Sequence, residues 1–216
     1  MKKVISFALV LCMMISCIFC VNFSAATVDQ AEVSASTGPQ SQIQGAVILH
    51  CFNWSYNSIK NNLQAIKDAG YTAVQTSPVQ SPKDYNGGWR DQGGQWWKLY
   101  QPLDFKISNN TWLGTKNDLK ALCDTAESMG IKVIVDVVLN HMANDMSENT
   151  LHPWIPSEIK DNSDCWHDIS MNIYNYDNRY DVTHYCLTGL PDLNTANSTV
   201  QTHCKNFLKE AIAAGA

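Results

Sequence analysis

The amino-acid sequence predicts an α/β fold built from parallel βα units. Between positions 46 and 138, three short apolar runs alternate with two segments of helical periodicity, and this order favours parallel strands joined by helices. The runs are apolar without alternation, which is typical of strands that are covered on both faces. About 170 residues follow Gly45, which is enough for one domain by the usual prior.

The first βα unit is expected to start with a strand in the apolar run at residues 46–52. A helix is predicted over residues 57–69, where apolar side chains are spaced as on one face of an amphipathic helix. That face consists of Ile59, Leu63 and Ile66. Gly70 follows, in a place where glycine commonly ends a helix. The second strand is expected at residues 71–75.

A capping pattern introduces the second helix. A long polar and aromatic loop is expected over residues 77–114, and Thr115 then stands three residues before Asp118, as in a capping box. The apolar face of this helix consists of Leu119, Leu122 and Ala126. Gly130 ends the helix, and residues 131–138 are predicted to form the third strand.

Residues 140–197 carry no convincing strand or helix periodicity and are rich in polar residues and turn formers. A connection of this length is far longer than an ordinary βα loop, so we expect a small subdomain inserted after the third strand. A final helix is expected from Ser198, as its N-cap, to Gly215. Its apolar positions are Val200, Phe207, Leu208 and Ile212.

The N-terminal residues are expected to direct export. Lys2 and Lys3 precede a long apolar run that is followed promptly by small residues, as in a secretory signal peptide. We therefore expect a signal peptide at 1–26, a flexible leader at 27–44, and a secreted, extracellular protein without membrane contact after cleavage. The run approaches the ~20 residues that span a bilayer, so an uncleaved membrane anchor is the alternative.

Composition excludes several classes of partner. The net charge is −5 and charged residues make up 16% of the chain, so neither nucleic acid nor an anionic membrane surface is an expected partner. The seven Trp and eight Tyr suit a hydrophobic core and equally suit a cleft that binds sugars.

Five of the eight cysteines lie after the expected leader. None of them forms a C-x-x-C pair, so a zinc ribbon or a redox motif is not expected. Cys165 and Cys186 flank a loop-rich segment and are the pair best suited to a disulfide in an exported protein, a pairing that the sequence leaves open. Cys51, Cys123 and Cys204 fall in strand or helix patterns and are expected to be buried thiols.

The residues best suited to chemistry follow the third strand. Asp136, Asn140 and His141 occur in the motif D-V-V-L-N-H, and functional groups of a parallel sheet gather at the carboxyl ends of its strands. Asp and Asn can offer oxygen ligands to a hard cation, and His can offer a ring nitrogen to a substrate hydroxyl. The alternative is a strand end whose polar groups satisfy the loop backbone.

This motif resembles the first signature of glycoside hydrolase family 13, the α-amylase family. Four further blocks are similar to that family and occur in its order. They are L-H-C-F-N-W at 49–54, G-Y-T-A-V-Q-T-S-P at 70–78, W-W-K-L-Y-Q-P at 96–102 and G-L-P-D-L-N at 189–194. The resemblance covers essentially everything after Gly45 and is greatest to secreted bacterial α-amylases of the Bacillus subtilis type.

The resemblance implies a (β/α)8 TIM barrel, of which the chain would hold the first three βα units. Residues 45–139 would be the N-terminal part of the catalytic barrel, residues 140–197 an inserted irregular domain B after strand 3, and residues 198–216 the third barrel helix. Such a barrel typically needs ~250 residues, so we expect the chain to stop before the fourth strand.

A calcium site is implied as well. The motif's asparagine binds a structural Ca2+ in the family, which matches Asn140, and the aspartate of the L-P-D-L-N block matches Asp192. A backbone carbonyl nine residues before that aspartate matches Thr183. Amide, carboxylate and carbonyl oxygens suit Ca2+, which takes roughly six to eight oxygen ligands. The ion would clamp the insertion onto the barrel.

Substrate contacts are implied at five positions. His141 matches the histidine that hydrogen-bonds the sugar at the bond to be cut. Tyr100 matches the aromatic residue that stacks on that sugar, and Gln101 its polar neighbour. Trp97, with Trp96 beside it, matches a stacking platform one subsite further out. An aromatic ring can pack on the C–H face of a pyranose while polar groups bond its hydroxyls.

The implied function is that of an α-amylase, which hydrolyses internal α-1,4-glucosidic bonds of starch or malto-oligosaccharides by a retaining mechanism. Retaining enzymes need two carboxyl groups about 5 Å apart. The family carries these after later strands, so no catalytic residue is expected in this chain, and Asp84, Asp91 and Asp145 are not assigned that role. A non-catalytic starch- or calcium-binding protein and another family 13 transglycosylase are the alternatives. The full-length protein is expected to be a monomer.

Overall fold

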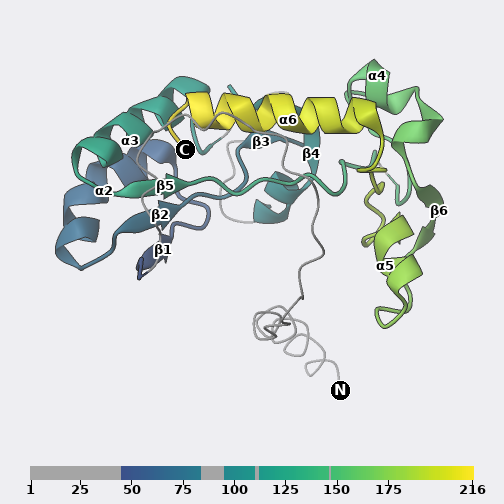
Figure 1. Ribbon diagram of the computed structural model, residues 1–216, viewed down its shortest axis with the longest axis horizontal. Coiled ribbons are helices and arrows are strands. Elements are labelled where there is room, and N and C mark those ends of the chain that lie inside the picture. Colours follow the sequence, from purple (N-terminus) through teal and green to yellow (C-terminus); the bar gives the residue numbers. More distant parts are fainter. Residues whose placement is uncertain (1–44, 84–94, 110–111, 146) are drawn as a thin grey trace, which may run out of the picture. The chain divides into compact units, whose positions relative to one another are not determined.

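A computed structural model of the protein describes residues 45–83, 95–109, 112–145 and 147–216 (Figure 1). The expected signal peptide at 1–26 and leader at 27–44 lie outside the described residues, as do Asp84 and Asp91. Within the described ranges, no helix combines the length and the apolar composition that a membrane span requires.

The predicted parallel sheet is present. It consists of β1 (Ile48–His50), β2 (Ala73–Gln75) and β5 (Lys132–Ile134), and both neighbouring pairs are parallel. The order β1-β2-β5 in the sheet follows the order in the chain, as successive βα units require. Ladder pairing covers three residues of each predicted apolar run.

The two predicted helices pack against each other. They are α2 (Tyr56–Asp68) and α3 (Lys116–Ser128). Thr115 and Asp118 form the predicted capping box at the start of α3, in which each side chain accepts the other residue's backbone N–H. The predicted apolar faces of both helices are buried and belong to the core. The helices therefore cover apolar surface that the sheet alone would leave open.

A second sheet lies within the segment predicted to be a long loop. β3 (Gln80–Pro82) and β4 (Pro102–Ile107) pair in antiparallel fashion, and a short 3-10 helix, η2 (Trp96–Tyr100), precedes β4. The loop prediction was therefore wrong for these residues. Alternate apolar residues of β4 are buried, namely Leu103, Phe105 and Ile107, which is the ordinary pattern of a half-buried strand.

The irregular segment 140–197 lies in the chain between β5 and the last helix. Its short elements are α4 (Ser157–Lys160), η3 (Ser163–Cys165), β6 (Asp168–Asn172), α5 (Arg179–His184) and β7 (Tyr185–Cys186). β6 and β7 pair in parallel with an irregular register. α4 contacts the last helix, and Figure 1 shows α4, β6 and α5 on the side of the view where that helix begins.

The last helix, α6 (Ser198–Ala213), differs from its prediction at the cap and on its buried face. The N-cap is Asn197 rather than Ser198, because Asn197 Oδ1 accepts from Thr199 N at 2.8 Å. Leu208 and Ile212 are 39% and 69% exposed. The buried positions are Val200, Phe207 and Ala211, which share one face of a helix with 3.6 residues per turn. α6 packs against β4.

All five cysteines among the described residues are free, so the disulfide considered between Cys165 and Cys186 is not formed. Cys165 Sγ lies 3.7 Å from Asn197 Oδ1, whereas Cys186 Sγ lies 3.6 Å from Ile169 O. Each thiol therefore lies against its own polar neighbour, and both cysteines are buried. Cys51 and Cys123 are buried as predicted, and Cys204 is half-buried.

Candidate functional site

The chain that follows β5 carries the candidate site. His141 forms an isolated antiparallel bridge with Asp192, and Leu193 N donates to Asn140 O at 2.9 Å. Backbone contacts therefore hold residues 140–141 directly against residues 192–193, although 52 positions separate Asn140 from Asp192.

The side chains of the first two predicted metal ligands meet. Asn140 Nδ2 donates to Asp192 Oδ1 at 2.9 Å, and His167 Nδ1 lies 2.6 Å from Asp192 Oδ2. Asp192 is only 3% exposed, and this burial raises the pKa of its carboxyl group against the lowering effect of the bonds from His167 and Asn140. His167 is a contact that sequence reasoning missed, since no motif marks it.

Thr183, the third predicted ligand, is linked to Asp192 only through two rings. It lies in the last turn of α5, and its Oγ1 is 2.8 Å from His184 Nδ1. The His184 ring packs on that of His167, with ring centroids 4.6 Å apart. The carbonyls of a last helical turn have no partner within the helix, which applies to the Thr183 carbonyl in α5.

The donor chemistry of these three residues fits a hard cation. An amide oxygen, a carboxylate and a backbone carbonyl are the ligand types that Ca2+ prefers. A buried carboxylate whose basic neighbours are the imidazoles of His167 and His141 also favours a cation, because desolvation penalises its charge. No group of three or more His, Cys, Asp or Glu in the described part of the chain is placed to hold a metal ion. The set therefore contains a single carboxylate and relies on neutral oxygens.

His141 is a buried imidazole with one unpaired nitrogen. Its Nε2 lies 2.9 Å from Tyr100 O, and a carbonyl can only accept, so Nε2 carries the proton of the neutral ring. Nδ1 is then an acceptor, and it is buried without a hydrogen-bond partner. Burial lowers the pKa of His141, partly opposed by the bond to Tyr100 O and by the charge of Asp192. The ring is therefore neutral near pH 7 and offers an acceptor to a hydroxyl.

Tyr100 and Gln101 approach His141 from the chain before β4. Ala143 N donates to Pro102 O at 2.8 Å, so residues 100–102 run alongside residues 141–143. The Tyr100 hydroxyl hydrogen-bonds the carboxylate of Asp136, and burial, the Asp136 charge and this bond together raise the pKa of Tyr100. Gln101 Oε1 is buried without a partner. The structure thus brings Tyr100, Gln101 and His141 together.

Trp96 and Trp97 extend the aromatic surface outward from Tyr100. They are 43% and 40% exposed. The Trp96 ring meets that of Tyr100 edge to face, with centroids 6.2 Å apart, and it also contacts Phe52 at 5.4 Å. Lys98 Nζ lies 5.5 Å from the centre of the Trp97 ring. Trp96 therefore adjoins the site directly, whereas Trp97 lies under a lysine.

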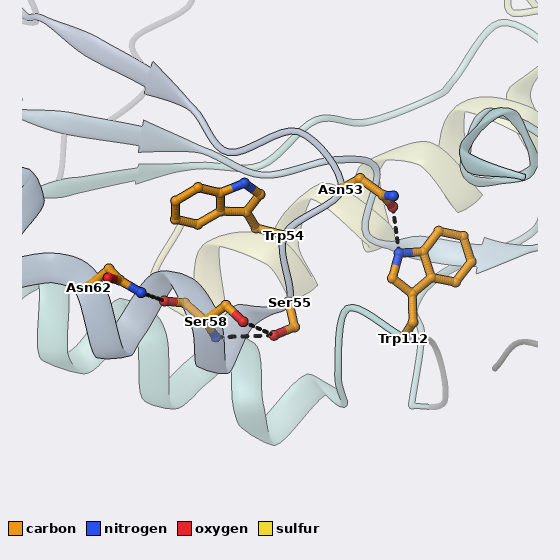
Figure 2. A pocket seen from close by; sticks show the side chains of 6 residues that line it. All are labelled: Asn53, Trp54, Ser55, Ser58, Asn62 and Trp112. Carbon is orange, nitrogen blue, oxygen red and sulfur yellow. Dashed lines mark hydrogen bonds between the residues drawn. The ribbon is translucent and has the colours of Figure 1, made fainter. Parts of the chain in front are cut away.

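A separate pocket of about 350 Å³ lies at the start of α2 (Figure 2). It is lined by Asn53, Trp54, Ser55, Ser58, Asn62 and Trp112. Asn53 Oδ1 accepts from Trp112 Nε1 at 2.5 Å. None of the predicted site residues lines this pocket, so it is distinct from the place where His141 and Tyr100 meet.

A parallel sheet in chain order, with His, Asn and aromatic residues gathered after its strands, is the arrangement expected of (β/α)8 TIM-barrel proteins, whose sites lie at the carboxyl ends of the strands. The family model described as "Alpha amylase, catalytic domain" matches residues 54–216. The chain therefore belongs to the α-amylase family, glycoside hydrolase family 13, and its fold is part of a (β/α)8 TIM barrel.

Bacterial α-amylases are among the similar proteins. The chain is 43% identical over 170 residues to an α-amylase of Clostridium acetobutylicum and 34% identical over 196 residues to one of Butyrivibrio fibrisolvens. These alignments cover 79% and 90% of this chain but 21% and 20% of the relatives. The chain thus spans about a fifth of their length.

Solved structures confirm the fold. A variant of α-amylase I from Eisenia fetida, in complex with maltohexaose, superposes with a TM-score of 0.66 at 25% identity, covering 78% of this chain and 36% of that one. An α-amylase of Geobacillus thermoleovorans, in complex with acarbose, has a TM-score of 0.62 at 22% identity over 79% and 38% of the two chains. The predicted α/β class and partial barrel are confirmed.

Proposed function

We propose that this chain is part of an α-amylase that hydrolyses internal α-1,4-glucosidic bonds of starch and related glucans with retention of configuration. The observation that carries the proposal is the buried, neutral ring of His141, held against Tyr100 O by Nε2 with Nδ1 unpaired. The α-amylases among the relatives support the reaction class. The maltohexaose bound to the Eisenia fetida protein supports an α-glucan as the ligand.

The proposed sugar contacts follow from the hydrogen-bonding groups that are left over. A hydroxyl of the glucan would donate to His141 Nδ1, while the bond from Nε2 to Tyr100 O holds the ring in one tautomer and one orientation. Gln101 Oε1 would accept from a second hydroxyl. Tyr100 would offer its ring face to the pyranose, since its hydroxyl is already bonded to Asp136. Trp96 and Trp97 would pack against neighbouring glucose units.

We place bond cleavage outside the described residues. A retaining glycosidase needs a nucleophile and an acid/base, two carboxyl groups about 5 Å apart. The carboxylates beside Tyr100 and His141 already bond neighbours that fix them: Asp136 bonds Tyr100, and Asp192 bonds Asn140 and His167. The 216-residue chain alone is therefore expected to bind glucan and to release no reducing sugar.

A structural Ca2+ is part of the proposal. Asn140, Asp192 and the carbonyl of Thr183 would hold it, and the bound ion would supply a fixed positive charge that joins residues 140–141 to the irregular segment. His167 would keep Asp192 oriented toward it. Affinity for Ca2+ depends on how many charged ligands a site has, so a single carboxylate predicts modest affinity.

The proposed enzyme acts outside the cell as a monomer. The secretory pattern of residues 1–26 supports export, and starch is a polymer that a cell meets outside its membrane. A non-catalytic starch-binding protein would share the sugar site. Genomic sequence downstream of codon 216 separates the two, because the enzyme requires further strands that carry the two carboxylates.

The sugar site is tested by titrating the purified chain with maltohexaose and following tryptophan fluorescence. We expect saturable binding that His141→Phe abolishes, because phenylalanine fills the space but offers no acceptor. His203→Phe is the matched control, since His203 packs on Phe105 with ring centroids 5.6 Å apart and takes no part in the proposed site. Failure of the chain to bind maltohexaose would overturn the proposal. Turnover of soluble starch by the pure chain would overturn our placement of the cleavage step.

A further inference from the structure

Gln80 is a fully buried polar residue at the first position of β3, and no sequence motif marks it. Its side chain is 0% exposed. Nε2 donates to Val138 O at 2.9 Å and to Asp104 O at 3.3 Å, and Oε1 accepts from Val138 N at 2.7 Å. The amide is therefore paired on both its donor and its acceptor side, as a buried polar group must be.

The two bonds to Val138 take the place of a neighbouring strand. Ladder pairing of β5 ends at Ile134, and Val138 lies four positions further along. A side-chain amide that bonds both the N–H and the C=O of one residue presents the same groups as a neighbouring peptide in a sheet. Gln80 thereby fixes the backbone two positions before Asn140 and three before His141.

The third bond joins the same amide to β4. Asp104 lies in the strand that directly follows Tyr100 and Gln101. One side chain thus connects the backbone that leads into His141 with the backbone that leads away from Tyr100. These are the two segments whose spacing decides whether His141 Nε2 meets Tyr100 O.

We propose that Gln80 is a positioning residue of the sugar site, which holds Val138 and Asp104 in register and so places His141 opposite Tyr100. This inference rests on the proposed function, because the ligand of His141 is the glucan of that proposal. Gln80 touches no substrate and acts only through His141 and Tyr100.

The first test compares Gln80→Met with the wild-type chain by two measurements, hydrogen exchange of the Val138 amide by NMR and maltohexaose affinity by titration. Methionine matches glutamine in length but cannot pair with Val138. Loss of these bonds is expected to speed Val138 exchange and to weaken maltohexaose binding, each on the order of tenfold. Exchange at Val74 and Val133 in the main sheet is expected to stay unchanged.

Leu63→Ala is the control for general destabilisation, since Leu63 is buried in α2 and belongs to the core rather than to the site. It is expected to lower the melting temperature and to speed exchange in the main sheet. The maltohexaose affinity of its folded molecules is expected to stay at the wild-type value.

Gln80→Glu adds a measurement, the pH dependence of maltohexaose affinity, that general destabilisation of the fold would not reproduce. At neutral pH its carboxylate faces the carbonyls of Val138 and Asp104, and binding is expected to be weak. Burial raises the pKa of such a carboxyl, and the protonated form can donate to Val138 O while still accepting from Val138 N. Its maltohexaose affinity, relative to wild type at the same pH, is expected to recover as the pH falls. Gln80→Met is expected to show no recovery.

Three results would count against the proposal. Unchanged Val138 exchange in Gln80→Met, wild-type maltohexaose affinity in that variant, or equal pH dependence of Gln80→Glu and Gln80→Met would each overturn it. If the wild-type chain binds no maltohexaose, the proposed function fails and the sugar-site role of Gln80 fails with it. The exchange measurement then still decides whether Gln80 fixes the segment before His141.

Discussion

Asp192 illustrates how burial prepares a single side chain for a ligand. Its two oxygens face Asn140 Nδ2 and His167 Nδ1, and neither partner is a permanent cation. Desolvation consequently raises the pKa of Asp192. A bound divalent ion would instead favour the ionised carboxylate of Asp192, because it brings the positive charge that the surroundings lack.

Asp192→Asn is therefore expected to have opposite consequences with and without calcium. Without the ion, the variant should melt near the wild-type temperature, because an amide of the same shape can still accept from Asn140 Nδ2 and bond His167 Nδ1, while the cost of a desolvated charge disappears. With millimolar Ca2+, the wild-type chain should gain stability by mass action, about 2–4 °C for each kcal/mol, and the variant should not. Asp168→Asn on the exposed surface of β6 is the control. An equal calcium-induced shift in wild type and Asp192→Asn would contradict the ligand assignment.

At the scale of elements, α3 depends on the side chains that begin it. The Thr115 side chain accepts from Asp118 N, and Asp118 Oδ2 accepts from Thr115 N at 2.8 Å. Thr115→Ala is expected to lower the free energy of unfolding by about 1 kcal/mol, since loss of an N-cap typically costs that much. Urea denaturation measures it. Thr125→Ala in the same helix is expected to have a much smaller effect, because Thr125 Oγ1 bonds only the carbonyl of Ala121 and alanine favours a helix. Equal losses in both variants would exclude a capping role.

The same cap predicts a pH dependence. The backbone and side-chain hydrogen bonds from Thr115 are the main causes that lower the pKa of Asp118. A depressed pKa means that the ionised form is favoured in the folded state, so its contribution is complete above the unfolded value of about 3.9 and is lost as the pH falls through the folded value. Below about pH 4, the wild-type chain should therefore lose more stability than Asp118→Asn does. Parallel losses of the urea midpoint in the two proteins would contradict this.

Local patterns predicted the elements that local interactions specify. The caps and the 3.6-residue periodicity of α2 and α3 are contained within a few turns of chain, and both helices lie where they were predicted. β6 has exposed residues at most of its positions, so no alternation marked it. For α6, tertiary packing on β4 selects Ala211 for the interior in place of the larger Leu208 and Ile212.

The residues of the candidate site also divide into those that a sequence motif marks and those that only the folded structure reveals. Asn140, His141 and Asp192 stand in motifs and could be named from the sequence. His167 and Gln80 could not, because their roles depend on contacts across 25 and 58 positions. Only the fold brings those positions together.

At the scale of the whole molecule, the described sheet ends at β1 on one side and at β5 on the other. Ile48 of β1 is 44% exposed, and an apolar strand at a sheet edge promotes pairing between molecules. Ile48→Lys is expected to reduce concentration-dependent association in light scattering or sedimentation. Ile212→Lys is the control, because Ile212 is an exposed apolar residue on a helix. If Ile212→Lys reduced association as much as Ile48→Lys, general surface hydrophobicity rather than strand pairing would be the cause.

Alkylation of the free cysteines can measure local opening of the fold. Burial raises the pKa of Cys51 and of Cys123 to about 11 each, and only a thiolate attacks an alkylating reagent. At neutral pH both sulfurs are covered and protonated, so iodoacetamide would react with them only in molecules that have opened locally. Cys51 follows β1, and Cys123 lies in α3. The alkylation rates of the two thiols would therefore report separately on local opening of the sheet and of the helices that pack on it, without any added label.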